Sequence, residues 1–169
     1  IGSTALLVQS IGGGGGFLGS AKDGVSFGGT NLKNISAGNI NVTNSSLITT
    51  TGGASAALVV QSLGGGGGVV SLTSNENIQL GGSNVIDAKS GDLNLKNSGN
   101  ITTTGNTSPL IMVQSIGGGG GYTTLNNEVA KADNTQTLQM GDDGSLRASS
   151  GSVTLNNSGN LYSTGASSS

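Results

Sequence analysis

The chain has 169 residues, of which 33 are glycine, with one proline, two phenylalanines and two tyrosines, and no cysteine, tryptophan or histidine. Charged residues make up 8% of it and the net charge is −2, against about 25% charged residues in a typical soluble domain. This balance excludes the basic surface of a nucleic-acid-binding protein, and the missing thiols exclude a disulfide framework. The sequence contains no run of about 18 apolar residues, the pattern that would predict a membrane-spanning helix. With so few aromatic residues, a core must be built from Ile, Leu and Val.

One block of sequence occurs three times, at residues 5–16, 57–68 and 110–121. Each copy is an aliphatic run, then Gln-Ser, one more aliphatic residue and five glycines. Self-similarity at a fixed period is typical of repeat architectures. We expect the block to be a structural motif, and its marker residues are Gln9, Ser10, Gly12, Gly16, Gln61, Ser62, Gly64, Gly68, Gln114, Ser115, Gly117 and Gly121.

A second block keeps the same register, at residues 38–52, 91–105 and 151–165. The two blocks together divide the chain into a partial unit 1–26, full units 27–79 and 80–139, and a partial unit 140–169. We interpret 1–169 as a single segment of a repeat array that belongs to a longer protein. The length variation falls just after the glycines, at 17–26, 69–79 and 122–139. These segments are predicted to be surface loops, where insertions are tolerated.

The local pattern predicts strands. Apolar and polar residues alternate in 92–97, and clusters of Gly, Asn and Ser bound each run, as is typical of short strands. Six strands per unit fit two three-sided coils. The predicted fold is therefore all-β, a parallel β-solenoid with about two coils per 52–60-residue repeat and columns of stacked aliphatic residues. Between residues 25 and 72, which include most of the first full unit, the strands are expected at roughly 25–27, 31–35, 39–43, 47–50, 57–63 and 69–72.

The motif strand is apolar on both faces, with Leu58 and Val60 on one and Val59 and Leu63 on the other. This pattern indicates a strand covered on both sides. One face belongs to the core, and the other is covered by the segment after the glycines, covered by another chain, or left uncovered; the pattern favours the segment after the glycines. Because glycine has no Cβ, the glycine tracts are predicted to be ordered layers that another backbone approaches closely.

Three asparagines, Asn44, Asn97 and Asn157, fall at equivalent strand ends. Stacked Asn side chains form amide ladders in repetitive β-structure. Asn is also a common solvated turn residue, because it tolerates left-handed backbone and bonds its own main chain. Both interpretations fit the sequence.

The sequence offers no set of catalytic, cofactor-binding or metal-binding residues, and we expect no enzyme. Nucleophilic catalysis lacks a His or Cys partner, and no Lys-Ser or Lys-Thr follows the glycines as in a phosphate-binding loop. In repeat register Asp87 matches Asn34 and Arg147, so no column of carboxylates forms. Gly141–Gly144 fits a calcium-binding turn or an ordinary Asp-Gly turn. A carbohydrate-active or carbohydrate-binding solenoid stays as a second alternative.

The block Val113–Gly121, Val-Gln-Ser-Ile followed by five glycines, is preceded by Asn-Ser-Gly-Asn-Ile-Thr-Thr-Thr-Gly at 97–105. Together they resemble the repeats of large autotransporter-type, adhesin-like passenger proteins of Gram-negative bacteria. The likeness extends over nearly the whole chain. It implies a right-handed parallel β-helix that is secreted and displayed at, or released from, the outer-membrane surface. It also implies a structural or adhesive role in cell adhesion, biofilm formation or a stalk.

Specific recognition, where it occurs, is expected in the longest insert, 122–139, although the sequence favours a simple spacer loop there. Partners would be other copies of the chain, or glycans or proteins on a host or neighbouring cell. The alternative to an adhesive surface segment is a self-assembling extracellular filament, in which the doubly apolar strand contacts another chain. The candidate contact residues of this insert are Tyr122, Glu128, Lys131 and Asp133.

Overall fold

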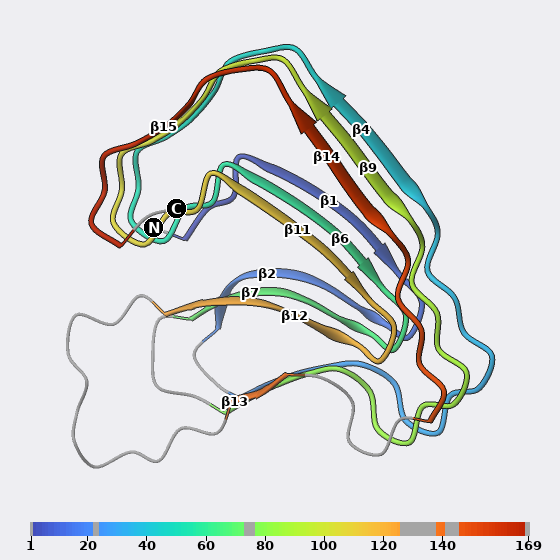
Figure 1. Cartoon of the computed structure of the whole chain (residues 1–169). Coiled ribbons are helices and arrows are strands. Elements are labelled where there is room, and N and C mark those ends of the chain that lie inside the picture. The colour runs from blue at the N-terminus through green and yellow to red at the C-terminus, as the bar shows by residue number, and fades with distance from the viewer. Residues whose placement is uncertain (1, 22–23, 73–76, 126–137, 141–145, 168–169) are drawn as a thin grey trace.

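The computed structural model describes residues 2–21, 24–72, 77–125, 138–140 and 146–167, and these contain strands, turns and no helix. Figure 1 views the stack end on, with equivalent strands lying over one another. The strands are β1 Leu6–Ile11, β2 Gly15–Ala21, β3 Val25–Phe27, β4 Ile40–Asn44, β5 Ile48–Thr50, β6 Leu58–Leu63, β7 Gly67–Leu72, β8 Ile78–Leu80, β9 Leu93–Asn97, β10 Ile101–Thr103, β11 Ile111–Ile116, β12 Gly120–Leu125, β13 Leu138–Met140, β14 Val153–Asn157 and β15 Leu161–Ser163.

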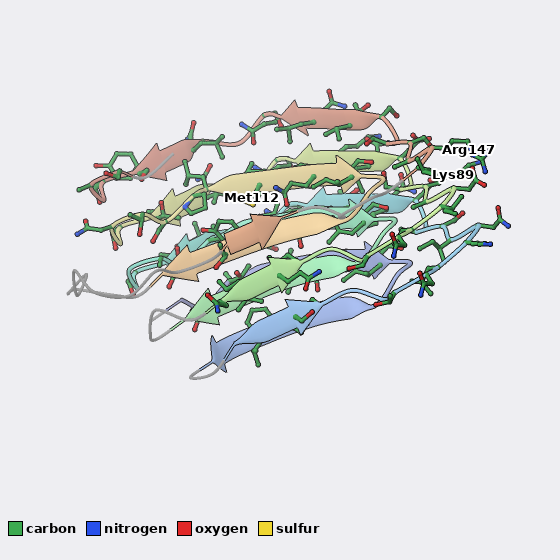
Figure 2. The ribbon with its side chains drawn as sticks, turned by 90° about the horizontal axis from the view of Figure 1, so that it is seen from below. Lys89, Met112 and Arg147 are labelled. Carbon is green, nitrogen blue, oxygen red and sulfur yellow. The ribbon has the colours of Figure 1, made fainter. Side chains whose placement is uncertain are left out.

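Each strand pairs in parallel with the strand five places along the chain. The five resulting three-stranded sheets have the orders β1-β6-β11, β2-β7-β12, β3-β8-β13, β4-β9-β14 and β5-β10-β15. The chain therefore completes one circuit in five strands. We call each circuit a coil, so that β1–β5, β6–β10 and β11–β15 form coils 1, 2 and 3, which Figure 2 shows one above another.

Equivalent residues of successive repeats lie in line. Val8 pairs with Val60, and Val60 pairs with Val113, within an unbroken six-residue register. The all-β, parallel, in-register arrangement predicted from the sequence is thus confirmed, and it is consistent with a β-solenoid.

The predicted count of two coils per repeat is wrong, because each repeat forms one. Two three-sided coils would have placed strands of the same repeat in one sheet. Instead the glycine tract turns the chain so that β2 lies against the face of β1, in a different sheet. Because neighbouring coils lie about 4.8 Å apart, one coil per repeat makes the stack about half as tall as two coils per repeat would.

The strand predicted at 31–35 is also absent. Asn31 and Asn34 have positive φ angles of 56° and 54°, so the backbone turns at both instead of staying extended. The segment touches the next coil only through isolated bridges, such as Thr30 to Ser83 and Lys33 to Ile86. Asn adopts the left-handed region more readily than most residues, which explains a corner here rather than a strand.

The motif sheet β1-β6-β11 is the central layer. One face, with Leu58 and Val60, packs on Leu93 and Leu95 of β9 in the main apolar cluster. The other face, with Val59, packs on the strand after the glycines. Val59, Leu93 and Leu95 are at most 1% exposed. The second face is therefore covered by the post-glycine segment of the same chain, which was the favoured of the possibilities left open.

A further apolar cluster lies behind the post-glycine sheet. Val70 of β7 packs there on Ile78 and Leu80 of β8. The molecule is thus layered in the order β4-β9-β14, β1-β6-β11, β2-β7-β12 and β3-β8-β13, with aliphatic side chains filling each space between layers (Figure 1).

The glycine tracts are ordered and stacked on one another, as predicted. Gly67 donates its N–H to the carbonyl of Gly14, and Gly120 donates to that of Gly66. In coil 2 the whole tract, residues 64–68, is buried. A side chain at Gly66 would start 2.7 Å from the oxygen of Gly14 and 2.8 Å from the Cα of Gly28, so the close backbone approach requires glycine there.

The extra length of the third repeat is confined to one connection. Leu72 pairs with Leu125 across 53 residues (125 − 72), whereas Ile78 pairs with Leu138 across 60 (138 − 78). Seven additional residues therefore lie between β12 and β13, and register is kept on both sides of them. The stack thus accepts insertions at this point without disturbing its columns.

We predict that Gly66→Leu lowers the free energy of unfolding by roughly 2–4 kcal/mol, because the side chain meets neighbouring backbone and Gly66 has a φ of +102°. Urea denaturation followed by circular dichroism measures this. The matched control is Gly53→Ala, whose Cβ would lie 3.8 Å from the nearest atom. Equal stability of the Gly66 variant and wild type would show that the tract is not packed as described.

Candidate functional site

The motif glutamines form a buried amide ladder along the stack. Gln9 donates from Nε2 to Oε1 of Gln61 at 2.8 Å, and Gln61 donates in the same way to Gln114 at 2.6 Å. Gln9 also reaches the carbonyl of Gly16 at 3.4 Å. Gln61 is completely buried, so its polar head requires these partners. The ladder joins the three coils between the motif sheet and the glycine-bearing sheet.

The motif serines point to the opposite face and tie the central sheet to the start of the next layer. The Oγ atoms of Ser10 and Ser62 accept the N–H groups of Gly38 and Gly91, at 2.7 and 2.8 Å. Ser62 in turn donates to the carbonyl of Gly38 at 3.1 Å. Ser115 repeats both bonds with Gly151 and Gly91. Sequence analysis missed this link, although the fixed spacing of Ser and Gly in both blocks carried the signal.

The asparagines at the strand ends form a second ladder. Asn44 donates from Nδ2 to Oδ1 of Asn97 at 2.7 Å, and Asn97 donates to Asn157 at 2.6 Å. Each amide also donates to a carbonyl two residues on, as Asn97 does to Gly99. Ladder and turn roles are therefore combined in one side chain, and the ladder interpretation is confirmed.

We predict that Gln61→Ala destabilises the fold by roughly 1–3 kcal/mol, because it leaves the amides of Gln9 and Gln114 without their shared partner in a poorly solvated layer. Thermal and urea unfolding measure the loss. Gln79→Ala is the matched control, because Gln79 is half-buried and its hydrogen bonds to other described residues are long contacts, of 3.4 and 3.5 Å, with serine hydroxyls. A loss in the Gln79 variant as large as that in the Gln61 variant would contradict a special role for the ladder.

Opposite charges meet at the corner before the outer sheet. Arg147 of coil 3 donates from Nε and Nη2 to the two carboxylate oxygens of Asp87 in coil 2, each at 2.7 Å. Both residues have positive φ angles, 57° and 58°, like Asn34 below them. In the repeat register Asp87 is matched with Arg147 rather than with another carboxylate, and the structure accordingly places the guanidinium of Arg147 next to the carboxylate of Asp87. Figure 2 shows Arg147 and Lys89 together at this edge, beside a shallow recess of about 170 Å³ lined by Asn34, Ser36, Asp87 and Lys89.

The hydrogen bonds from Arg147 hold the pKa of the Asp87 carboxyl below its ordinary value, and Asp87 raises the pKa of Arg147. Two bonds from Ser152 lower the pKa of Asp92 in the same way. A depressed folded-state pKa stabilises the fold above the unfolded value of about 3.9. This contribution is lost as the pH falls through the lower, folded value.

We predict that Arg147→Gln moves the pKa of Asp87 upward, because its largest cause is the bond from Arg147. Titration of the carboxyl carbon by NMR measures the shift. Lys89→Gln should move the pKa of Asp87 less, since the charge of Lys89 lowers that pKa less than Arg147 does. Equal shifts in the two variants would contradict the paired geometry.

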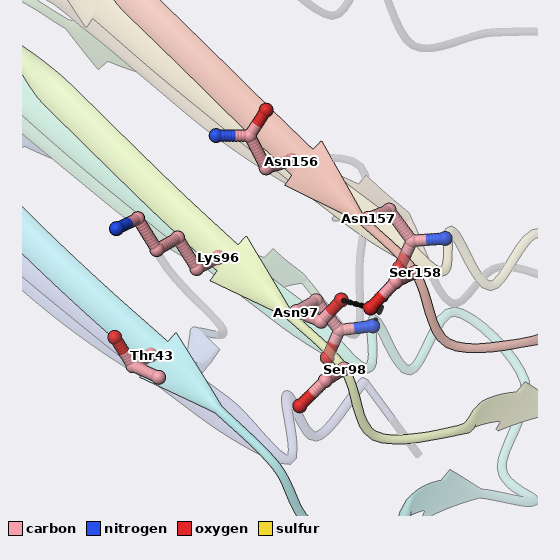
Figure 3. Close-up of a pocket in the computed structure, with 7 residues that line it drawn as sticks. All are labelled: Thr43, Lys96, Asn97, Ser98, Asn156, Asn157 and Ser158. Carbon is pink, nitrogen blue, oxygen red and sulfur yellow. Dashed lines mark hydrogen bonds between the residues drawn. The ribbon is translucent and has the colours of Figure 1, made fainter.

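A second and larger recess lies on the outer face of β4-β9-β14, near the ends of these strands (Figure 3). It has a volume of about 520 Å³ and is open to solvent. Lys96 lies in it, between Thr43 of coil 1 and Asn156 of coil 3 in the same column. No described carboxylate forms an ion pair with Lys96. The lining is completed by two amides and two hydroxyls, from Asn97, Asn157, Ser98 and Ser158.

The candidate contact residues separate into two groups. Tyr122 lies in strand β12 rather than in a loop, and its ring packs with Met112 and Val69 on the inner face. Burial raises the pKa of its phenol. Glu128, Lys131 and Asp133 lie outside the described residues, as does the Asp-Gly turn at 141–144.

The described residues contain no group of three or more carboxylate, imidazole or thiol side chains placed to hold a metal ion. Nor does any described segment form a helix suited to crossing a bilayer.

Known proteins provide no identification. No family model, curated protein or solved structure matches the chain.

Proposed function

We propose that this chain is a structural and adhesive segment of a secreted bacterial surface protein, a right-handed β-helix that presents polar faces and insert loops to other cells. The resemblance of its Val-Gln-Ser-Ile-Gly₅ and Asn-Ser-Gly-Asn-Ile-Thr₃-Gly blocks to autotransporter-type passenger repeats suggests the surface location. The chemistry of the fold supports a mechanical role.

The observation that carries the proposal is that the motif residues make their hydrogen bonds and packing contacts within the chain itself. The three glutamines bond to one another, the serines bond to backbone, and the glycine tracts stack on glycine. Repetition in this sequence therefore serves the stack itself. An extended rod of such coils needs no charged core, no metal and no disulfide, which suits a protein that is exported through a membrane and folds outside the cell.

We assign the adhesive contacts to the parts of the chain that lie outside the stacked columns and differ between repeats. The connection after β12 absorbs seven added residues without loss of register. The outer sheet face adds the recess around Lys96, with its amide and hydroxyl groups. Donors and acceptors of this kind suit the hydroxyls of a glycan, and this recess favours a carbohydrate-binding role as the second candidate function.

The proposal predicts that antibodies raised against this chain label intact cells of the source organism, and that their Fab fragments reduce attachment of these cells to a surface. Labelling that requires permeabilised cells would rule out surface display. If the antibodies label intact cells but the Fab fragments do not reduce attachment, the result would support a stalk role and contradict an adhesive one.

The carbohydrate candidate is tested separately by glycan-array binding. Lys96→Gln should reduce binding, whereas Lys33→Gln, at an exposed position outside the recess, should not. Binding that both variants retain in full would assign the glycan contact elsewhere.

A further inference from the structure

The outer side of the β4-β9-β14 layer carries three rows of exposed side chains, and the first row is bonded within the chain. In it, the backbone N–H of Asp92 donates to Oδ1 of Asn39 at 2.8 Å. Ser152 donates to the Asp92 carboxylate from its N–H at 2.8 Å and from its hydroxyl at 2.9 Å. These polar groups join one coil to the next, so they serve the stack itself.

The other two rows are exposed, and their side chains make no hydrogen bond with another described residue. Figure 3 shows the row that contains Lys96, with its three side chains on the same side of neighbouring strands. The donors and acceptors of both rows are therefore available to a ligand. The two rows are Asn41, Asn94 and Thr154, and Thr43, Lys96 and Asn156.

The fold does not require a cation at position 96. The register partners of Lys96 are Thr43 in coil 1 and Asn156 in coil 3, so neutral side chains occupy the same place in the other coils. Lys96 lies in the middle coil, with a paired strand on each side. The positive charge is therefore an addition to the stack at a position that the stack does not need it.

This charge is not neutralised by a described carboxylate. Lys96 is the one charged side chain among the residues that line the recess. Of the described carboxylates, Asp87 is paired with Arg147, and Asp92 accepts two bonds from Ser152. The Cα atoms of Asp92 and Lys96 are four strand residues apart, about 13 Å, which exceeds the screening length of about 8 Å at physiological salt.

The wall of the recess is held in place by the asparagine ladder. Asn97 donates to Asn157 at 2.6 Å, and each of the two amides donates to the carbonyl two residues on, at 2.8 Å. A wall that is already ordered does not have to be fixed when a ligand binds. The volume of about 520 Å³ is in the range of small-ligand sites, and the open mouth allows a longer polymer to pass through.

We propose that this recess binds the carboxylate or sulfate group of an acidic glycan. The ammonium group of Lys96 pairs with the anionic group, and Thr43 and Asn156, each one coil away at about 4.8 Å, bond to neighbouring sugar hydroxyls. This inference rests on the carbohydrate-binding role proposed above and names the class of glycan.

The test is biolayer interferometry with the purified chain in solution and two matched pairs of immobilised polysaccharides. One pair is polygalacturonate and its carboxyl-reduced, neutral form, and the other is dextran sulfate and dextran. We expect binding to at least one acidic polymer and much weaker binding to its neutral partner. Which acidic polymer binds distinguishes a uronic acid from a sulfated sugar. Raising the salt concentration should weaken the binding, because it screens the ion pair.

Lys96→Gln should weaken binding to the acidic polymer roughly three- to tenfold, the range expected when one exposed, charge-assisted contact is lost. Lys96→Arg, which keeps the charge, should retain binding. The matched control is Lys33→Gln, which removes the same charge at an exposed position outside the recess and should bind as wild type. Circular dichroism confirms that the variants keep their β-structure.

Three results would overturn the inference, and they differ in what they leave standing. Equal binding of an acidic polymer and its neutral partner, still lost in Lys96→Gln, would keep a glycan site but not an acidic one. Equal weakening by Lys96→Gln and Lys33→Gln would show attraction to the whole surface rather than to the recess. If none of the four polymers binds, the carbohydrate-binding role fails as well, while display at the cell surface is still decided by the antibody labelling.

Discussion

Everything in this fold depends on equivalent residues of successive repeats pairing directly, one coil above the next. That single constraint replaces a conventional core. Side chains of modest size, such as Val60 and Leu95, become fully buried because they have copies of themselves above and below. The same register converts isolated polar groups into ladders, so that an amide as costly to bury as that of Gln61 has a donor on one side and an acceptor on the other.

The composition follows from this constraint. Four layers of sheet are stacked in a cross-section with few aromatic residues, and one pair of layers is brought together by the glycine tracts. Glycine loses more conformational entropy on folding than other residues, yet here it permits backbone-to-backbone packing that a Cβ at Gly66 would obstruct. Charges are needed only at the outside, where Asp87 and Arg147 pair between coils. The outer faces carry Asn, Ser and Thr. These polar side chains suit a protein that contacts its surroundings through its sheet faces.

Sequence reasoning identified most of the strands, the columns and, as the favoured of several possibilities, the cover of the doubly apolar motif strand, because each depends on local alternation and on repeat register. It failed on the number of coils, since alternation shows where a strand lies but not which strand it pairs with. The error at 31–35 had a readable cause: Asn31 and Asn34 stand three residues apart, and both adopt positive φ. The bonds of Ser62 to Gly38 and Gly91 and the recess around Lys96 join segments that are distant in sequence, and only the assembled layers bring them together.

The most direct test of the account is a disulfide placed across one coil step. Thr49 and Thr102 are register partners on the outer face of neighbouring strands β5 and β10, and the chain has no cysteine of its own. With one coil per repeat, Thr49→Cys combined with Thr102→Cys brings the two Cα atoms within the 4.4–6.8 Å that a disulfide needs, since strands lie about 4.8 Å apart. The account predicts rapid intramolecular oxidation of this pair at low protein concentration, and much slower oxidation of Thr49→Cys with Thr104→Cys, which is two residues out of register. Slow oxidation of both pairs, as expected if another coil lay between Thr49 and Thr102, would contradict it.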